Sequence, residues 1–130
     1  MKATFAKKTR VPVERTQQAI QVLLKKHGAE AFGTYGDSTT AAVAFKMRGL
    51  SYRIELPVPK SDEQGFRARW RLVLLLVRAK LELVAVGAST IEREFLADQV
   101  MPNGKTVGDS FPKIIQAALG GGDVRRLLSA

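Results

Sequence analysis

The chain has 130 residues, of which 45% are apolar and 25% are charged, and this composition is typical of one globular domain and excludes a wholly disordered chain. It contains no cysteine and one histidine, so a disulfide framework and a thiolate metal site are excluded, and a histidine-based catalytic triad is not expected. Lysine and arginine (21) outnumber aspartate and glutamate (12), which gives a net charge of +9 and predicts a polyanionic partner, nucleic acid first.

The chain divides into a basic arm, one domain and a tail. Residues 1–10 carry no acidic side chain, and we expect a flexible arm there, one domain over 11–119 and a flexible glycine-rich tail over 120–130. The arm is not followed by the apolar segment of a secretory signal. The apolar run over residues 72–77 is far shorter than a membrane-spanning helix, which needs about 20 apolar residues. We therefore expect a cytoplasmic protein with no membrane contact.

The N-terminal half predicts a helix followed by a small sheet. A helix is predicted over 12–27, because apolar residues recur there at helical spacing and Gly28 is a natural stop. Residues 31–35 form a short candidate strand. Residues 41–47 and 50–58 alternate apolar and polar side chains around a short turn, which predicts a hairpin with one buried face. The apolar face includes Tyr52, which is therefore expected in the core.

A long helix is predicted over 62–86, between a capping box at 61–64 and Gly87. At about 100° per residue its apolar side chains form two separate faces, with Arg67, Arg71 and Arg78 between them on one side. One face holds Trp70, Val73, Val77, Leu81 and Val84, and the other holds Leu72, Leu76, Ala79 and Leu83.

Two arrangements cover both faces of this helix. In a monomer, the sheet takes one face and the later helices take the other. In a homodimer, a twin helix covers the face of Leu72, Leu76, Ala79 and Leu83. Because the later helices contain enough apolar residues to do this internally, both arrangements stay open. Trp70 is expected in the core in either case.

Two shorter helices are predicted after the long one. The first runs over 90–100 behind a capping box at 89–92, and the second over 109–119 behind Asp109. The apolar side chains Phe111, Ile114, Ile115 and Leu119 would point inward from the second. The predicted fold class is therefore α+β: an N-terminal helix, an antiparallel sheet of two or three strands, a long central helix and two or three shorter C-terminal helices.

Distinctive motifs are spread over most of the chain. They are Val11-Pro12-Val13-Glu14, Leu56-Pro57-Val58-Pro59, Arg69-Trp70-Arg71, Arg78-Ala79-Lys80-Leu81-Glu82, Glu94-Phe95-Leu96 and Pro102-x-Gly104-x-Thr106-Val107-Gly108. This pattern resembles a family of small uncharacterised proteins encoded by tailed bacteriophages and prophages. The resemblance implies a phage origin and action in the host bacterial cytoplasm, and it carries no catalytic residue with it.

Three features that suggest catalysis have simpler explanations. Gly104-Lys105-Thr106 resembles the end of a phosphate-binding loop, but that motif requires glycine where Gln99 stands, so a turn is predicted. His27 suits the last turn of a helix, where a cation complements the dipole. Glu94 and Asp98 are four residues apart on a predicted helix, but no histidine accompanies them, which favours a solvated face. We therefore expect no enzyme, no metal and no cofactor.

Basic residues supply the strongest functional signal. Residues 66–80 contain five basic side chains and no acidic one, and strand alternation places further cations on the exterior of the hairpin. Neutralising phosphates requires several cations on one surface. The predicted nucleic-acid-binding residues are Lys7, Lys8, Arg10, Lys46, Arg48, Arg53, Arg67 and Arg71.

The predicted function is contact with DNA or RNA through this basic surface, with little reading of sequence. The contact would serve replication, recombination or takeover of the host. The alternative is a protein-interaction factor or inhibitor that acts on a host or defence protein through an acidic surface of that protein.

Overall fold

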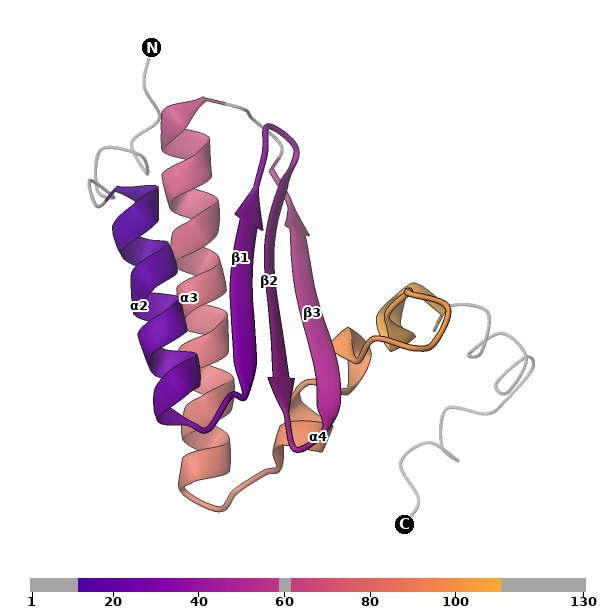
Figure 1. The fold of residues 1–130 in the computed structure, drawn as a ribbon. Coiled ribbons are helices and arrows are strands. Elements are labelled where there is room, and N and C mark those ends of the chain that lie inside the picture. Colours follow the sequence, from indigo (N-terminus) through magenta and orange to yellow (C-terminus); the bar gives the residue numbers. More distant parts are fainter. Residues whose placement is uncertain (1–11, 59–61, 111–130) are drawn as a thin grey trace, which may run out of the picture.

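The computed structural model describes residues 12–58 and 62–110, and the structural statements below refer to these residues. The elements follow in the order α2 (Val13–Lys26), β1 (Ala31–Gly36), β2 (Thr40–Met47), β3 (Leu50–Pro57), α3 (Glu63–Ala85), α4 (Ile91–Glu94) and the 3-10 helix η1 (Leu96–Asp98). Figure 1 shows α2 and α3 side by side, running in the same direction on one face of the three-stranded sheet. The predicted α+β fold is confirmed.

Helix α2 ends where the sequence predicts a stop. Gly28 has a φ of 93°, which is the left-handed conformation that glycine adopts without strain. The amide of Ala29 then donates to the carbonyl of Leu24 at 3.0 Å, and His27 occupies the C-cap. This closure turns the chain directly into β1.

The three strands form an antiparallel sheet in the order β1-β2-β3. β2 and β3 are joined at Arg48 and Gly49, whose φ values of 52° and 81° are both positive. Two such residues fit a type I′ turn, whose twist matches that of the flanking strands. In the resulting register Phe45 lies opposite Tyr52, so both rings point to the face that the helices cover.

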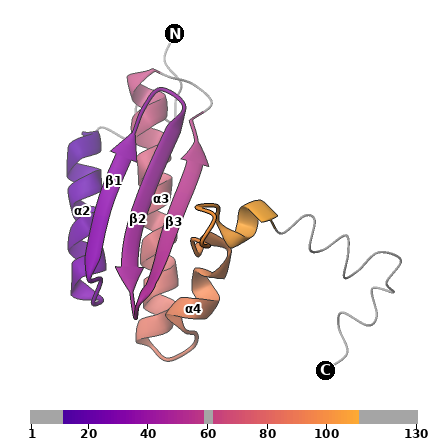
Figure 2. The same cartoon turned by 45° about the vertical axis from the view of Figure 1, so that its right-hand side comes forward.

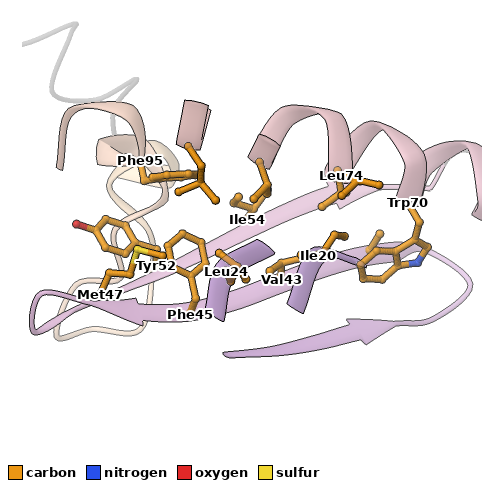
Figure 3. Packing of buried hydrophobic residues seen from close by; sticks show 14 of the residues in the cluster. Ile20, Leu24, Val43, Phe45, Met47, Tyr52, Ile54, Trp70, Leu74 and Phe95 are labelled. Atoms are coloured by element: carbon orange, nitrogen blue, oxygen red, sulfur yellow. The ribbon is translucent and has the colours of Figure 1, made fainter. Parts of the chain in front are cut away.

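The core lies between the sheet and the two helices. Trp70 is fully buried at one end of it, and Phe95 is fully buried at the other (Figure 3). The ring of Phe95 meets Phe45 edge-on with centroids 5.1 Å apart, and Phe45 stacks on Tyr52 at 5.3 Å. The predicted core positions of Trp70 and Tyr52 are confirmed.

Helix α3 begins with a single side-chain cap. The carboxylate of Asp62 accepts a hydrogen bond from the amide of Gly65 at 2.7 Å, which is the contact an N-cap residue makes. The helix then runs from Glu63 to Ala85, as predicted within one residue at each end. Its Trp70 face packs on the sheet and on α2.

The second apolar face of α3 has no cover among the described residues. Leu72, Leu75 and Leu83 are exposed, and Ala79 lies among them. The prediction placed Leu76 on this face, but Leu76 is partly buried against the core cluster. Successive helical residues differ by about 100° in direction, so Leu76 lies at one edge of this face, where it packs against the core cluster, and Leu75 lies at the other edge. The predicted short helices do not close this face within residues 62–110.

The helix predicted over 90–100 is shorter than expected. Phe95 leaves the helical conformation with φ −114° and ψ 20°, which ends α4 after four residues and directs the ring into the core. The chain then continues through η1, and the amide of Val100 donates to the carbonyl of Ser51 at 2.8 Å. Figure 2 shows this segment beside β3. Core packing of one aromatic ring thus outweighs the helical pattern.

The next helix begins earlier than the sequence predicted. Thr106 and Asp109 cap each other: each amide donates to the other's side-chain oxygen at 3.3 Å, and residues 107–110 are helical. This is a capping box, in which Thr106 rather than Asp109 is the first residue. The remainder of the helix predicted over 109–119, the arm 1–10 and the tail 120–130 lie outside the described residues.

Candidate nucleic-acid interface

The basic residues predicted on the hairpin are largely neutralised by acidic neighbours. Arg48 lies in the β2–β3 turn, where its Nε is 3.1 Å from a carboxylate oxygen of Glu92. Arg53 points from the outer face of β3, pairs with Glu55 and donates to the carbonyl of Gly104 at 2.9 Å. Lys46 is exposed and makes no ion pair with a described residue. One of these three cations therefore remains available.

The outer face of the sheet is hollowed, but the hollow is not cationic. Small side chains, Gly33, Ala42 and Ala44, form the floor of a cavity of about 400 Å³, and Arg53 and Glu55 line it together. Tyr35 stands at its margin, where its hydroxyl donates to Asp37 at 2.8 Å. This hydrogen bond raises the pKa of Tyr35 above its ordinary value. The paired charges leave little attraction for a polyanion.

The two predicted residues on α3 differ in their surroundings. Arg67 forms an ion pair with Glu63 one turn earlier and lines a hollow at the N-terminal ends of α2 and α3, together with Glu14. This hollow is net acidic. Arg71 is exposed and makes no ion pair among the described residues. The predicted set therefore divides between two faces of the molecule, and Lys7, Lys8 and Arg10 lie outside the described residues.

A third hollow, between α2 and α3, brings together basic residues that the predicted set did not contain. It has a volume of about 490 Å³, and no acidic side chain lines it. Its rim carries Arg15 and Lys26 from α2 and Arg78 from α3. No described carboxylate is within 4.0 Å of these three cations. Its remaining lining consists of Gln18, Ala19, Val22 and Leu23. We call this site the α2–α3 groove.

Helical periodicity explains why these cations converge. Arg15 and Lys26 are eleven residues apart, which is three turns, so both lie on the same side of α2. Arg71 and Arg78 are seven residues apart, which is two turns, so Arg71 extends the basic line along α3. Helical spacing in the sequence already placed Arg71 and Arg78, the part of this basic line that belongs to α3, on one side of the helix. The missing half could have been found by applying the same spacing to the cations of α2.

The acidic residues after α3 surround a lysine and do not form a metal site. Lys80 donates to the carbonyl of Glu94 at 2.6 Å, and its ammonium lies 5.6 Å from the centre of the Phe95 ring. Burial raises the pKa of Asp98, and Lys80 opposes this shift. Within the described ranges there is no group of three potential metal ligands, and no helix has the length and apolarity needed to cross a membrane.

Comparisons with protein-family models, with curated proteins and with solved structures find no match to this chain.

Proposed function

We propose that this protein binds DNA or RNA, without reading its sequence, through the α2–α3 groove. The observation that carries the proposal is the convergence of Arg15, Lys26 and Arg78 on one hollow in which no described carboxylate neutralises them. Lysine and arginine side chains that neutralise phosphates release the cations condensed on the nucleic acid, and this release is the main source of non-specific affinity.

Comparison with the other two hollows supports this choice. The hollow on the sheet combines Arg53 with Glu55, and the one at the helix N-termini combines Arg67 with Glu14 and Glu63. An arginine paired with a carboxylate must give up or share that partner to neutralise a phosphate, so it contributes little to net binding. The α2–α3 groove is cationic without such compensation.

The uncharged lining of the groove supports binding without base recognition. Apart from the three cations, the lining consists of Gln18, its one uncharged polar side chain, and of aliphatic side chains. Arginine can also read guanine edges, but in this proposal Arg15 and Arg78 neutralise phosphates, which leaves Gln18 as the one side chain of the lining that can form paired hydrogen bonds to a base edge. Contacts to the backbone predict similar affinity for unrelated sequences and a steep dependence on salt. If the phage resemblance holds, the contact serves replication, recombination or takeover of the host, in the bacterial cytoplasm.

Matched charge reversals test the proposal. Fluorescence anisotropy would measure the binding of single- and double-stranded DNA and RNA oligonucleotides to the wild type and to two double variants. Arg15→Glu with Arg78→Glu changes the groove, whereas Arg93→Glu with Lys105→Glu changes two exposed cations outside it. Both variants alter the net charge equally, so they separate a local contact from the overall field.

We expect the groove variant to lose about 10- to 100-fold in affinity near 0.1 M salt, because each lost phosphate contact removes nearly one unit of salt slope. The control variant should lose much less. Equal losses in the two variants would contradict the groove assignment. Absence of oligonucleotide binding by the wild type at low salt would contradict nucleic-acid binding altogether and would favour an acidic protein surface as the partner.

A further inference from the structure

The face of α3 that points away from the sheet is apolar and open to solvent. Leu72 and Leu75 are each 43% exposed, Leu83 is 44% exposed and Val86 is 76% exposed. Ala79, also exposed, lies in the middle of this stripe. Four of the eight large apolar side chains that are exposed among the described residues belong to it. An apolar patch concentrated on one face of one helix is typical of an interaction surface.

The stripe is symmetric about its smallest member. Leu75 and Leu83 lie four residues before and after Ala79, and Leu72 and Val86 lie seven residues before and after it. Helical residues four and seven apart share a face, so the stripe reads the same from either end. A two-fold interface must be complementary to itself, and it places each residue against its counterpart across the axis.

We infer that α3 pairs with α3 of a second copy in antiparallel orientation, with the two-fold axis passing beside Ala79. This pairing sets Leu75 against Leu83 of the second copy, and Leu72 against Val86 of the second copy. The two alanines meet at the crossing point, where a small side chain allows two helices to approach at 8–10 Å between axes. The symmetry of the stripe selects a second copy of this chain over an unrelated partner.

Charges beside the stripe favour the same arrangement. Arg78 lines the α2–α3 groove, and Glu82 follows it by one turn on the same flank of α3, outside the lining of the groove. A two-fold axis perpendicular to the helices brings the corresponding flanks of both copies to the same side. Glu82 of each copy then lies next to Arg78 of the other, about 3 Å apart along the helix axis at a rise of 1.5 Å per residue. This pairing in the dimer lowers the charge that Arg78 gives to the α2–α3 groove, whereas Arg15 and Lys26 keep theirs. A parallel pair would place corresponding flanks on opposite sides of the interface, so Arg78 and Glu82 of the two copies would not meet.

Salt separates this association from nucleic-acid binding. Each copy carries a net charge of +9, so the two copies repel each other at long range, and added salt screens this repulsion. Self-association should therefore persist or strengthen as salt increases, whereas nucleic-acid binding weakens. Failure of either proposal can thus be recognised independently of the other.

Single cysteines test the geometry, because the natural chain contains none. In Ala79→Cys the two sulfur-bearing residues face each other, with Cα atoms about 4–5 Å apart, which suits a disulfide. In Leu72→Cys the two identical positions lie about 20 Å apart, because each is seven residues from the axis. Leu96→Cys, exposed on η1 outside the stripe, is the control.

Under mild oxidation of the 130-residue chain, we expect Ala79→Cys to form a cross-linked dimer. Leu72→Cys and Leu96→Cys alone should remain single chains, and an equal mixture of Leu72→Cys and Val86→Cys should cross-link. Self-cross-linking of Leu72→Cys as readily as Ala79→Cys would indicate parallel helices and overturn the inference.

Light scattering completes the test. The wild type should approach twice its chain mass of 14.2 kDa at about 100 μM, a concentration that populates dimers of micromolar affinity. Leu75→Glu should give a folded monomer by circular dichroism, and Leu96→Glu should remain dimeric. A wild-type mass near that of one chain would overturn the inference, and this includes the case in which residues 111–119 of the same chain cover the stripe.

Discussion

Two tyrosines in opposite surroundings provide a stability test of the core. Tyr52 is 1% exposed, and its hydroxyl has no hydrogen-bonding partner among the described residues. Burial raises the pKa of this hydroxyl, as expected for a phenol removed from water. Tyr35 is exposed, and its hydroxyl donates to Asp37 at 2.8 Å. Replacement by phenylalanine therefore removes an unpaired polar group in one case and a hydrogen bond in the other.

We expect Tyr52→Phe to stabilise the fold. A buried polar atom left without a partner costs about 1–3 kcal/mol, and removal of this hydroxyl eliminates that cost. The ring remains, so its stacking on Phe45 at 5.3 Å is kept and no cavity larger than one oxygen forms. A gain of 1 kcal/mol corresponds to an increase of about 4–8 °C in Tm for a domain of up to about 100 residues. Tyr35→Phe, the matched control, should lower Tm slightly.

Differential scanning calorimetry and urea denaturation would measure both variants against the wild type. The predicted result is an increase in the free energy of unfolding for Tyr52→Phe and a decrease for Tyr35→Phe. A loss of 1 kcal/mol or more in Tyr52→Phe would refute the reasoning, because it would show that the buried hydroxyl has a hydrogen-bonding partner.

Three further predictions concern stability. Trp70→Ala should cost about 3–5 kcal/mol, because a fully buried indole is lost; a small loss in urea denaturation would contradict its core role. Asp62→Ala should cost about 1 kcal/mol by removing the cap of α3, and an unchanged urea midpoint would show that the cap is dispensable. Burial raises the pKa of Asp98 in the folded state, so its ionisation opposes folding as the pH rises through that pKa. Asp98→Asn should therefore raise Tm more at neutral pH than in acid, and an equal effect at both would argue against this linkage.

Alternation and helical spacing predicted most of the fold because burial enforces both patterns. A one-residue slip would turn Phe45 and Tyr52 to solvent, so the sheet could be derived from sequence. The early end of the helix predicted over 90–100 could not be derived in this way. Ile91 and Phe95 have helical spacing, yet Phe95 leaves the helix to reach Phe45, a contact that spans fifty residues of sequence. Local pattern carries no information about such a contact.

The candidate site was harder to predict than the fold. The cationic composition indicated a polyanionic partner, but which cations are available depends on ion pairs between distant segments. Arg48 meets Glu92, and Arg53 meets the carbonyl of Gly104. These contacts depend on how the segment after α3 packs beside β3. The α2–α3 groove likewise depends on distant segments. The three strands separate α2 from α3 in the sequence, yet the two helices lie side by side on the sheet (Figure 1).

The salt dependence of oligonucleotide binding tests the central claim most directly. The logarithm of the affinity for double-stranded DNA would be measured against the logarithm of the salt concentration for the wild type and for the variant Arg15→Ala, Lys26→Ala and Arg78→Ala. Each phosphate contact contributes about 0.9 to this slope, so three lost contacts should reduce its magnitude by about 2.7. The same reduction should appear for unrelated sequences. An unchanged slope in the triple variant would show that nucleic acid does not contact the α2–α3 groove.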